Sequence, residues 1–188
     1  MENIEYLNRY ERQLTELLLR EVTRRRYLDG QLLHSDDLDE KWHQIAPDYV
    51  SDAVPQIAEY PSVALAWAGY VGMALAAYWD EDWQRYSRNP NLYLYLRNKQ
   101  GFDLLDEYVL YKVLKLPEGG MEASSLEDLM RSCAHLTLDL IRHEQIEPQS
   151  VLAFHVYARS IKVIFRIGVA VELKRRRYKY EKISLEKN

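Results

Sequence analysis

The chain has 188 residues, of which 47% are hydrophobic and 29% are charged, and this length and balance are typical of one soluble folded domain. The formal net charge of −4 argues against general affinity for nucleic acids. The single cysteine, Cys133, excludes an intramolecular disulfide framework and a cysteine-rich metal site.

The N-terminal segment, residues 2–28, is predicted to form an amphipathic helix that ends before Gly30. Its apolar residues recur at helical spacing: Leu7, Tyr10, Leu14, Leu17 and Leu18. The first residues are polar and lack the apolar core of a secretory signal, so we expect a cytoplasmic protein.

Residues 31–46 are predicted to form an acidic connector, and a short helix over residues 47–59 is predicted to begin at Pro47. Glu40 and His43 have the Glu-x-x-His spacing that di-iron helical bundles use. Such bundles need a second copy of this motif, which the sequence lacks. We therefore predict no metal site here.

The segment from Pro61 to about Ser87 is predicted to be a buried central helix, because the run from Val63 to Trp79 contains no charged residue. Its small residues recur every four positions and would let a neighbouring helix approach closely: Ala64, Ala68, Gly72 and Ala76. A membrane-spanning helix is the alternative, since roughly 17–25 apolar residues cross a bilayer. We favour the soluble interpretation and predict no membrane contact, because acidic residues crowd one end with no basic flank.

Acidic residues end this segment, with Asp80, Glu81 and Asp82 lying between Trp79 and Trp83. Carboxylates near the C-terminus of a helix oppose its dipole. They are either solvated, as the helix becomes amphipathic, or need a compensating partner.

The middle of the chain is predicted to contain further helices, separated by Asn89-Pro90 and by the loop over residues 117–124. The helix after this loop has an apolar stripe with Cys133 at its centre. A thiol in that position is expected to pack in the core rather than to react.

The last helix is predicted to begin at Pro148 and to be largely buried up to residue 175. Its polar exceptions are mainly His155, Arg159, Lys162 and Arg166. These four fall within an arc of about 60° at about 100° per residue. Isolated charges are prohibitively costly to bury. This basic row is therefore solvated, or pairs with carboxylates of another helix such as Asp80 or Asp82, or lines a groove for an anionic group.

We place the folded domain over residues 1–175 and interpret residues 176–188 as a basic C-terminal tail that is prone to fraying. Basic residues mixed with tyrosines, over 24–27 and 174–180, can track single-stranded nucleic acid. The acidic net charge and the positions at helix ends favour ordinary dipole complementarity instead.

Motifs for catalysis and for cofactors are absent: the sequence has no Gly-rich phosphate loop, G-x-S-x-G, H-E-x-x-H or C-x-x-C. His135, Asp139 and His143 stand four residues apart on one predicted helix, but on its water-facing side, which does not suit a catalytic metal. We predict neither a metal nor another cofactor and assign no catalytic residue, and we expect a protein that is not an enzyme.

These patterns together predict an all-α, single-domain bundle of six or seven helices with two largely buried central helices, 61–87 and 148–175. The leading functional hypothesis is an interaction or adaptor protein whose tyrosine-rich surface, with 15 Tyr, holds a protein partner or a second copy. This hypothesis predicts an exposed apolar patch.

The alternative is a helical bundle that binds or transforms an anionic small molecule in an interhelical pocket. The residues expected to line that pocket are Trp79, Asp80, Asp82, His155, Arg159, Lys162 and Arg166. This hypothesis predicts an enclosed cavity into which the basic row points.

Overall fold

The structure, a computed structural model, describes residues 2–178. These residues form helices and connecting turns without a β-strand, so the predicted all-α bundle is confirmed. The helices are α1 (Glu2–Arg24), α2 (Asp36–Ala53), α3 (Pro61–Glu81), α4 (Trp83–Arg88), α5 (Leu92–Gln100), α6 (Leu105–Glu107), α7 (Met121–His143) and α8 (Val151–Arg175). A 3₁₀ turn (Val54–Gln56) follows α2, and a π-helical turn (Tyr108–Val113) follows α6.

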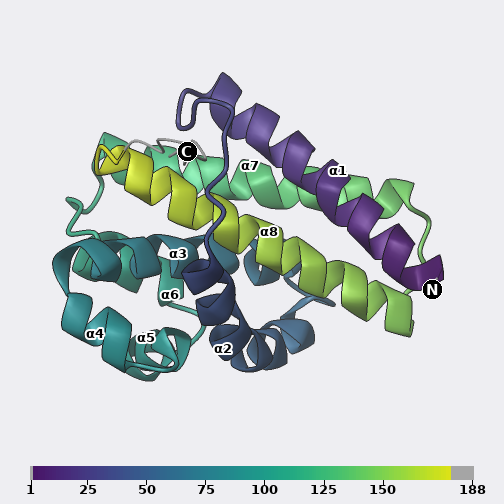
Figure 1. The fold of residues 1–188 in the computed structure, drawn as a ribbon, viewed down its shortest axis with the longest axis horizontal. Helices are drawn as coiled ribbons and strands as arrows, with labels where there is room; N and C mark the ends of the chain where they lie inside the picture. The colour runs from purple at the N-terminus through teal and green to yellow at the C-terminus, as the bar shows by residue number, and fades with distance from the viewer. Residues whose placement is uncertain (1, 179–188) are drawn as a thin grey trace, which may run out of the picture.

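The helices α3 and α8 form the centre of the bundle and pack directly on each other (Figure 1). Both are buried over most of their length, as predicted for the two central helices. The predicted small-residue groove is used at Gly72, where a β-carbon would overlap the carbonyl oxygen of Phe165 on α8. The two backbones therefore approach more closely than larger side chains would allow.

The amphipathic helices α1 and α7 cover one side of this central pair (Figure 1). The buried hydroxyl of Tyr10 on α1 lies 2.7 Å from Oγ of Ser160 on α8. The hydroxyl of Ser132 on α7 donates a hydrogen bond to Glu21 on α1 over 3.1 Å. These contacts fix the rotation of α1, which decides which of its carboxylates faces α8.

The helices α2, α4 and α5 lie together on the other side of the central pair (Figure 1). Lys41 of α2 donates to the carbonyl oxygen of Tyr86 near the end of α4 over 2.7 Å, where a cation is favoured by the helix dipole. The hydroxyl of Tyr86 in turn donates to Asp37 of α2 over 2.6 Å. The two contacts fix α4 against α2 and hold the Tyr86 ring in place.

The expectation that residues 31–46 form a connector and that a helix begins at Pro47 is wrong, because α2 begins at Asp36. The hydroxyl of Ser35 caps α2 by accepting a hydrogen bond from the backbone N–H of Leu38 over 3.5 Å. The acidic residues of the first turn also stabilise the helix, because negative charge is favourable at the N-terminal end of the helix dipole. Pro47 lies inside α2, where its missing N–H removes one backbone hydrogen bond.

The helix expected over residues 61–87 is divided at Asp82. The Asp82 carboxylate caps α4 by accepting the N–H of Arg85 over 3.2 Å, so a new helix starts at Trp83. With this break and the short α6, the described residues contain eight α-helices, where six or seven were expected.

Among the described helices, α3 is long and apolar enough to cross a membrane. Most of its apolar segment is buried inside the protein, against α8 and α7. This burial is compatible with a soluble protein, in which the core helix meets the same criteria of length and composition.

Candidate functional site

Two members of the basic row of α8, Arg159 and Lys162, pair with a carboxylate of α1. Arg159 donates to one carboxylate oxygen of Glu11, and Nζ of Lys162 lies 3.1 Å from the other. The Glu11 side chain is largely buried, so the two cations stabilise a carboxylate that would be costly to bury alone. Pairing with another helix was one of the roles expected for the row, but the partners suggested for it, Asp80 and Asp82, are not the ones used.

The ionisation of Glu11 follows from these contacts. Burial raises the pKa of the Glu11 carboxyl, but the hydrogen bond from Arg159 and the charge of Lys162 more than compensate, so this pKa lies below its ordinary value. Glu11 is therefore ionised at neutral pH and forms an ion pair with each of the two cations. A small anion would have to compete with Glu11 for the donors of Arg159 and Lys162.

Arg166, the last member of the row, is 8% exposed. Its guanidinium donates to the carbonyl oxygen of Leu33 over 3.2 Å and lies 2.7 Å from Nδ1 of His34. Because arginine only donates, the His34 ring accepts here through an unprotonated Nδ1. The Nε of Arg166 has no hydrogen-bond partner among residues 2–178. Arg166 of α8 thus holds the segment between α1 and α2 in place through its hydrogen bonds.

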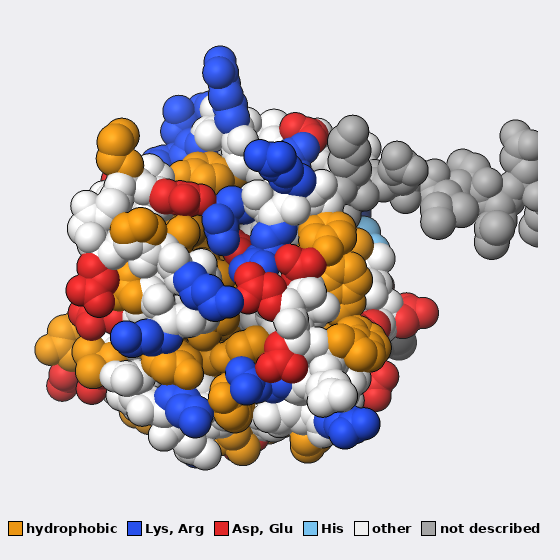
Figure 2. All heavy atoms as spheres, turned by 90° about the vertical axis from the view of Figure 1, so that its left-hand side faces the viewer, with side chains coloured by type: hydrophobic (Ala, Val, Ile, Leu, Met, Phe, Trp, Pro, Cys, Tyr) orange, Lys and Arg blue, Asp and Glu red, His pale blue; other side chains and the backbone are white. Residues whose placement is uncertain are grey.

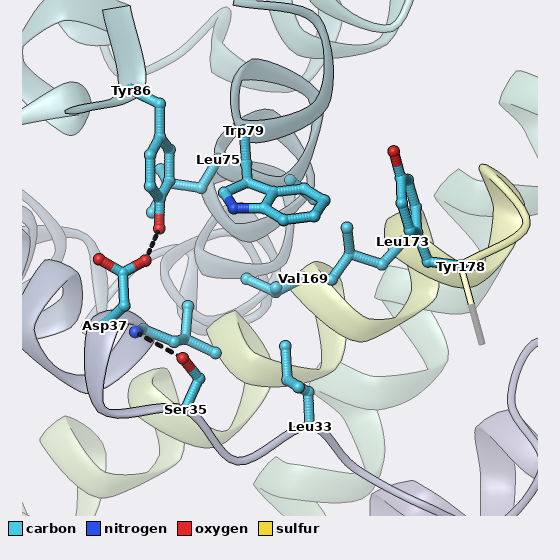
Figure 3. A pocket seen from close by; sticks show the side chains of 11 residues that line it. Leu33, Ser35, Asp37, Leu75, Trp79, Tyr86, Val169, Leu173 and Tyr178 are labelled. Carbon is cyan, nitrogen blue, oxygen red and sulfur yellow. Dashed lines mark hydrogen bonds between the residues drawn. The ribbon is translucent and has the colours of Figure 1, made fainter. Parts of the chain in front are cut away.

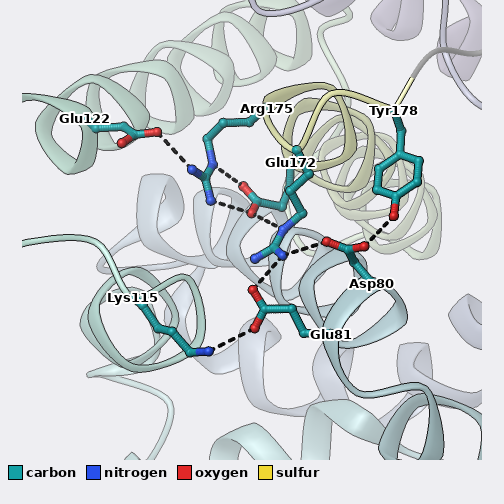
Figure 4. Close-up of polar contacts among 8 residues, drawn as sticks. Asp80, Glu81, Lys115, Glu122, Glu172, Arg175 and Tyr178 are labelled. Atoms are coloured by element: carbon teal, nitrogen blue, oxygen red, sulfur yellow. Dashed lines mark hydrogen bonds and ion pairs between the residues drawn. The ribbon is translucent and has the colours of Figure 1, made fainter.

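The acidic end of α3 pairs with the end of α8 (Figure 4). Asp80 and Glu81 accept hydrogen bonds from Arg176 over 3.0 and 2.8 Å, and Glu81 also accepts from Lys115 over 3.1 Å. Tyr178 donates to Asp80, and the hydrogen bonds from Tyr178 and Arg176 lower the pKa of the Asp80 carboxyl. These are the compensating partners that carboxylates need at a helix C-terminus.

Glu172 lies within the same charge network and is fully buried, with 0% exposure. It accepts hydrogen bonds from Arg175 and from Arg176, each over 2.7 Å, so that Arg176 joins the carboxylates of α3 to a buried carboxylate of α8. Figure 2 faces the end of the molecule where α3 and α8 finish, and it shows acidic and basic side chains side by side in the middle of this face, with hydrophobic side chains around them. Arg176 and Tyr178, which the sequence assigned to the tail, therefore contact the helical body; residues 179–188 lie outside the described residues.

A cavity of about 260 Å³, here called the Trp79 cavity, lies beside the same end of α3 (Figure 3). Its aromatic walls are Trp79, Tyr86 and Tyr178. The remaining lining is mainly aliphatic: Leu33, Leu38, Leu75, Ala76, Val169 and Leu173. Among the residues that the structure describes, Asp37 is the only charged one in the lining, and Ser35 supplies its only hydroxyl outside the tyrosines. Of the seven candidate residues, Trp79 alone lines this cavity.

A groove of about 630 Å³, here called the α7–α8 groove, lies between the segment that follows α2, the end of α7 and the first turns of α8. Most of its lining is apolar, including Val54, Ile57, Ile141, Ile146, Phe154 and Tyr157. Phe154 is 46% exposed, and Val151, which lies one turn before it on α8, is 75% exposed. His155 is exposed beside Phe154, and the two rings meet edge to face with centroids 5.6 Å apart.

The seven candidate residues do not come together in one pocket. Asp82 caps α4 and pairs with Arg85 at 3.4 Å, and the basic row is divided between α1, the segment before α2 and solvent. Sequence reasoning missed Glu172, although a carboxylate in an apolar run, followed by arginines three and four residues later, was a usable signal. No comparable signal marks Glu11.

Among the described residues, no group of three or more His, Cys, Asp or Glu side chains is placed to hold a metal ion. No protein-family model, no curated protein and no solved structure matches the chain.

Proposed function

We propose that the protein is an interaction module and that the α7–α8 groove binds an apolar segment of a different protein. One observation carries the proposal: Phe154 and Val151 are exposed beside a groove that is itself lined by apolar side chains. Soluble proteins rarely leave a large continuous apolar surface in contact with water unless that surface binds something. Aromatic anchors in such surfaces supply much of the binding energy.

Arg142 indicates the charge of the partner. Within residues 2–178 it is the only charged residue in the lining of the groove, and its side chain remains largely exposed although it pairs with Asp139 at 3.0 Å. A carboxylate of the partner can pair with Arg142 at the rim, where charge sets specificity and association rate. The expected occupant is an amphipathic segment with an apolar anchor and a flanking acidic residue, as in recognition of a helix by a groove.

A small anionic ligand on the basic row is less well supported, because Glu11 already pairs with Arg159 and Lys162 and would compete with the ligand for them. The groove also has few fixed polar groups that could orient a small molecule. The hydroxyl of Ser150, for example, is engaged as the cap of α8, where it accepts the N–H of Ala153 over 3.0 Å.

We also propose a cytoplasmic location. This location is compatible with the burial of α3 inside the bundle.

The test is a peptide selection followed by calorimetry. Peptides are selected from a random display library on the full-length protein, and the affinity of each is measured for the protein and for Phe154→Ala. We expect Phe154→Ala to weaken binding by about tenfold or more, because truncating a central aromatic anchor costs about 2 kcal/mol or more. The matched control is Met121→Ala, which removes a side chain that is 88% exposed at the other end of α7 and should leave affinity unchanged.

Circular dichroism and Tm must show that both variants fold. Equal peptide affinity of the protein and of Phe154→Ala would contradict the proposal. Selected peptides that lack acidic residues and bind Arg142→Ala as tightly as the protein would also contradict it. Sedimentation of the protein alone provides a separate check. A dimer that Phe154→Ala dissociates would assign the groove to a second copy of the chain and would exclude the proposed foreign partner.

A further inference from the structure

The Trp79 cavity has walls that suit an organic cation. Three aromatic residues surround it, from α3, from α4 and from the chain after α8, over an aliphatic floor (Figure 3). The faces of aromatic rings attract cations, and tryptophan does so most strongly. Trp79 is 40% exposed and meets Tyr178 edge to face, with ring centroids 5.2 Å apart. The Trp79 ring is therefore open to a ligand from solvent.

Asp37 supplies the charge that complements such a ligand. Its Oδ2 accepts the hydroxyl of Tyr86 over 2.6 Å, while Oδ1 has no hydrogen-bond partner within the described part of the chain. Figure 3 shows this carboxylate at the edge of the cavity, on the same side as Tyr86. A cation near Oδ1 would therefore gain an ion pair without breaking the hydrogen bond that positions Asp37.

Lys41 and Arg166 lie near the cavity but do not line it, and both are engaged elsewhere. Lys41 donates to the carbonyl oxygen of Tyr86, and its ammonium lies 4.7 Å from the centroid of the Tyr86 ring. Arg166 donates to the carbonyl oxygen of Leu33. Among residues 2–178, the lining thus presents one negative charge and no positive charge, which disfavours an anionic ligand.

From this geometry we propose that the Trp79 cavity binds a small amine or quaternary ammonium compound with an apolar body. The cationic group lies on the Trp79 ring within reach of Asp37, and the apolar body displaces water from the leucine and valine side chains of the floor. The cavity volume of about 260 Å³ equals the liquid volume of roughly eight or nine water molecules at about 30 Å³ each. This space accepts a compound with one aromatic ring.

The cavity shares no lining residue with the α7–α8 groove, so the two proposals can fail independently. The test of the cavity uses three probes with one carbon skeleton and different charge: phenylpropylammonium, phenylpropanol and phenylpropanoate. Each is titrated into the full-length protein by calorimetry at neutral pH. We expect the ammonium to bind about tenfold more tightly than the alcohol, and the carboxylate to bind most weakly.

Asp37→Asn removes the charge but keeps an oxygen acceptor for Tyr86. We expect this variant to lose about tenfold in affinity for the ammonium and to keep its affinity for the alcohol. Asp36→Asn is the matched control, because it makes the same change in net charge at an adjacent exposed residue outside the lining. Trp79→Leu keeps an apolar side chain and should weaken the binding of the ammonium more than the binding of the alcohol.

Several results would overturn the proposal. The first is no binding of the ammonium by the folded protein at millimolar concentration. The second is equal affinity for all three probes. The third is an equal loss of affinity in Asp36→Asn and Asp37→Asn, which would assign the effect to the general charge of the surface. An unchanged Tm in each variant excludes loss of the fold as the cause.

Discussion

The carbonyl oxygen of Gly69 on α3 occupies the space that a β-carbon at Gly168 on α8 would need, so the two central helices cross backbone against backbone. Gly72 makes the same kind of contact with the backbone of Phe165. At Gly69 itself, an added β-carbon would overlap only the Sδ atom of the Met130 side chain. The crossing therefore depends on glycine at positions 168 and 72 more than at position 69.

Gly168→Ala is expected to lower the free energy of unfolding by at least about 3 kcal/mol, because the backbone of α3 cannot move away without unpacking the core. This loss exceeds the gain of about 1 kcal/mol that alanine brings as a better helix former. Gly69→Ala should cost only about 1 kcal/mol, because the flexible Met130 side chain can change rotamer. Urea unfolding of both variants measures the difference, and equal losses would contradict the backbone contact.

Arg176→Ala is expected to destabilise the protein by about 3 kcal/mol, because it leaves the buried Glu172 with Arg175 alone and removes the cation that Asp80 and Glu81 share. The control is the neighbouring Arg177→Ala, since this exposed side chain forms no ion pair with another described residue. Its effect should stay within about 0.5 kcal/mol. A similar loss of unfolding free energy in both variants, measured by chemical unfolding, would show that the charge network around Arg176 does not stabilise the protein specifically.

Stability is expected to fall in acid, because the pKa values of Glu11, Asp80 and Glu81 are lowered in the folded protein. Carboxyls with a lowered folded pKa stabilise the protein above their unfolded pKa, about 3.9 for Asp and 4.3 for Glu, and lose this contribution as the pH falls through the folded value. Urea midpoints measured from about pH 7 down to about pH 2.5 should therefore decrease below about pH 4.

The same titration in Arg176→Ala should show a shallower decrease, because Arg176 is a principal cause of the lowered pKa values of Asp80 and Glu81. An identical acid slope in the protein and in Arg176→Ala would mean that these carboxyls do not couple to the arginine.

Cys133 is expected to resist alkylation in the native protein. Burial raises the pKa of its thiol to about 12, and the reactive species is the thiolate. Iodoacetamide at neutral pH should therefore react with Cys133 only through transient opening of the bundle, and much faster in urea. Mass spectrometry follows the adduct with time. Fast labelling of the folded protein would contradict the burial of Cys133, whereas faster labelling of Gly168→Ala than of the native chain would support the opening route.

Features that depend on one helix alone could be predicted from the sequence. The uncharged run after Val63 and the small residues that include Gly72 indicated a buried helix with a close neighbour, and the structure confirms this packing. The acidic end at Asp80 was recognised as needing a partner, because a helix dipole is a local property. The partner itself, Arg176, was assigned to the tail.

Features that depend on how two helices are turned toward each other could not be predicted. Glu11 faces Arg159 and Lys162 only because α1 packs on α8 at one rotation and one register. Asp37 and Tyr86 form a hydrogen bond at the edge of the Trp79 cavity although many residues separate them in the chain. Hydrophobic periodicity fixes which face of each helix is buried, but not which polar side chains of two helices come into contact.

The central claim is that the α7–α8 groove holds a segment of another protein, and site-specific photo-cross-linking tests it most directly. A photo-reactive phenylalanine analogue replaces Phe154 in the groove or, as a control, Met121 at the far end of α7. The claim predicts one specific protein adduct from position 154 and none from position 121. Mass spectrometry should place the cross-link in an apolar segment of the partner that carries a neighbouring carboxylate. No adduct from position 154, or the same adducts from both positions, would contradict the claim.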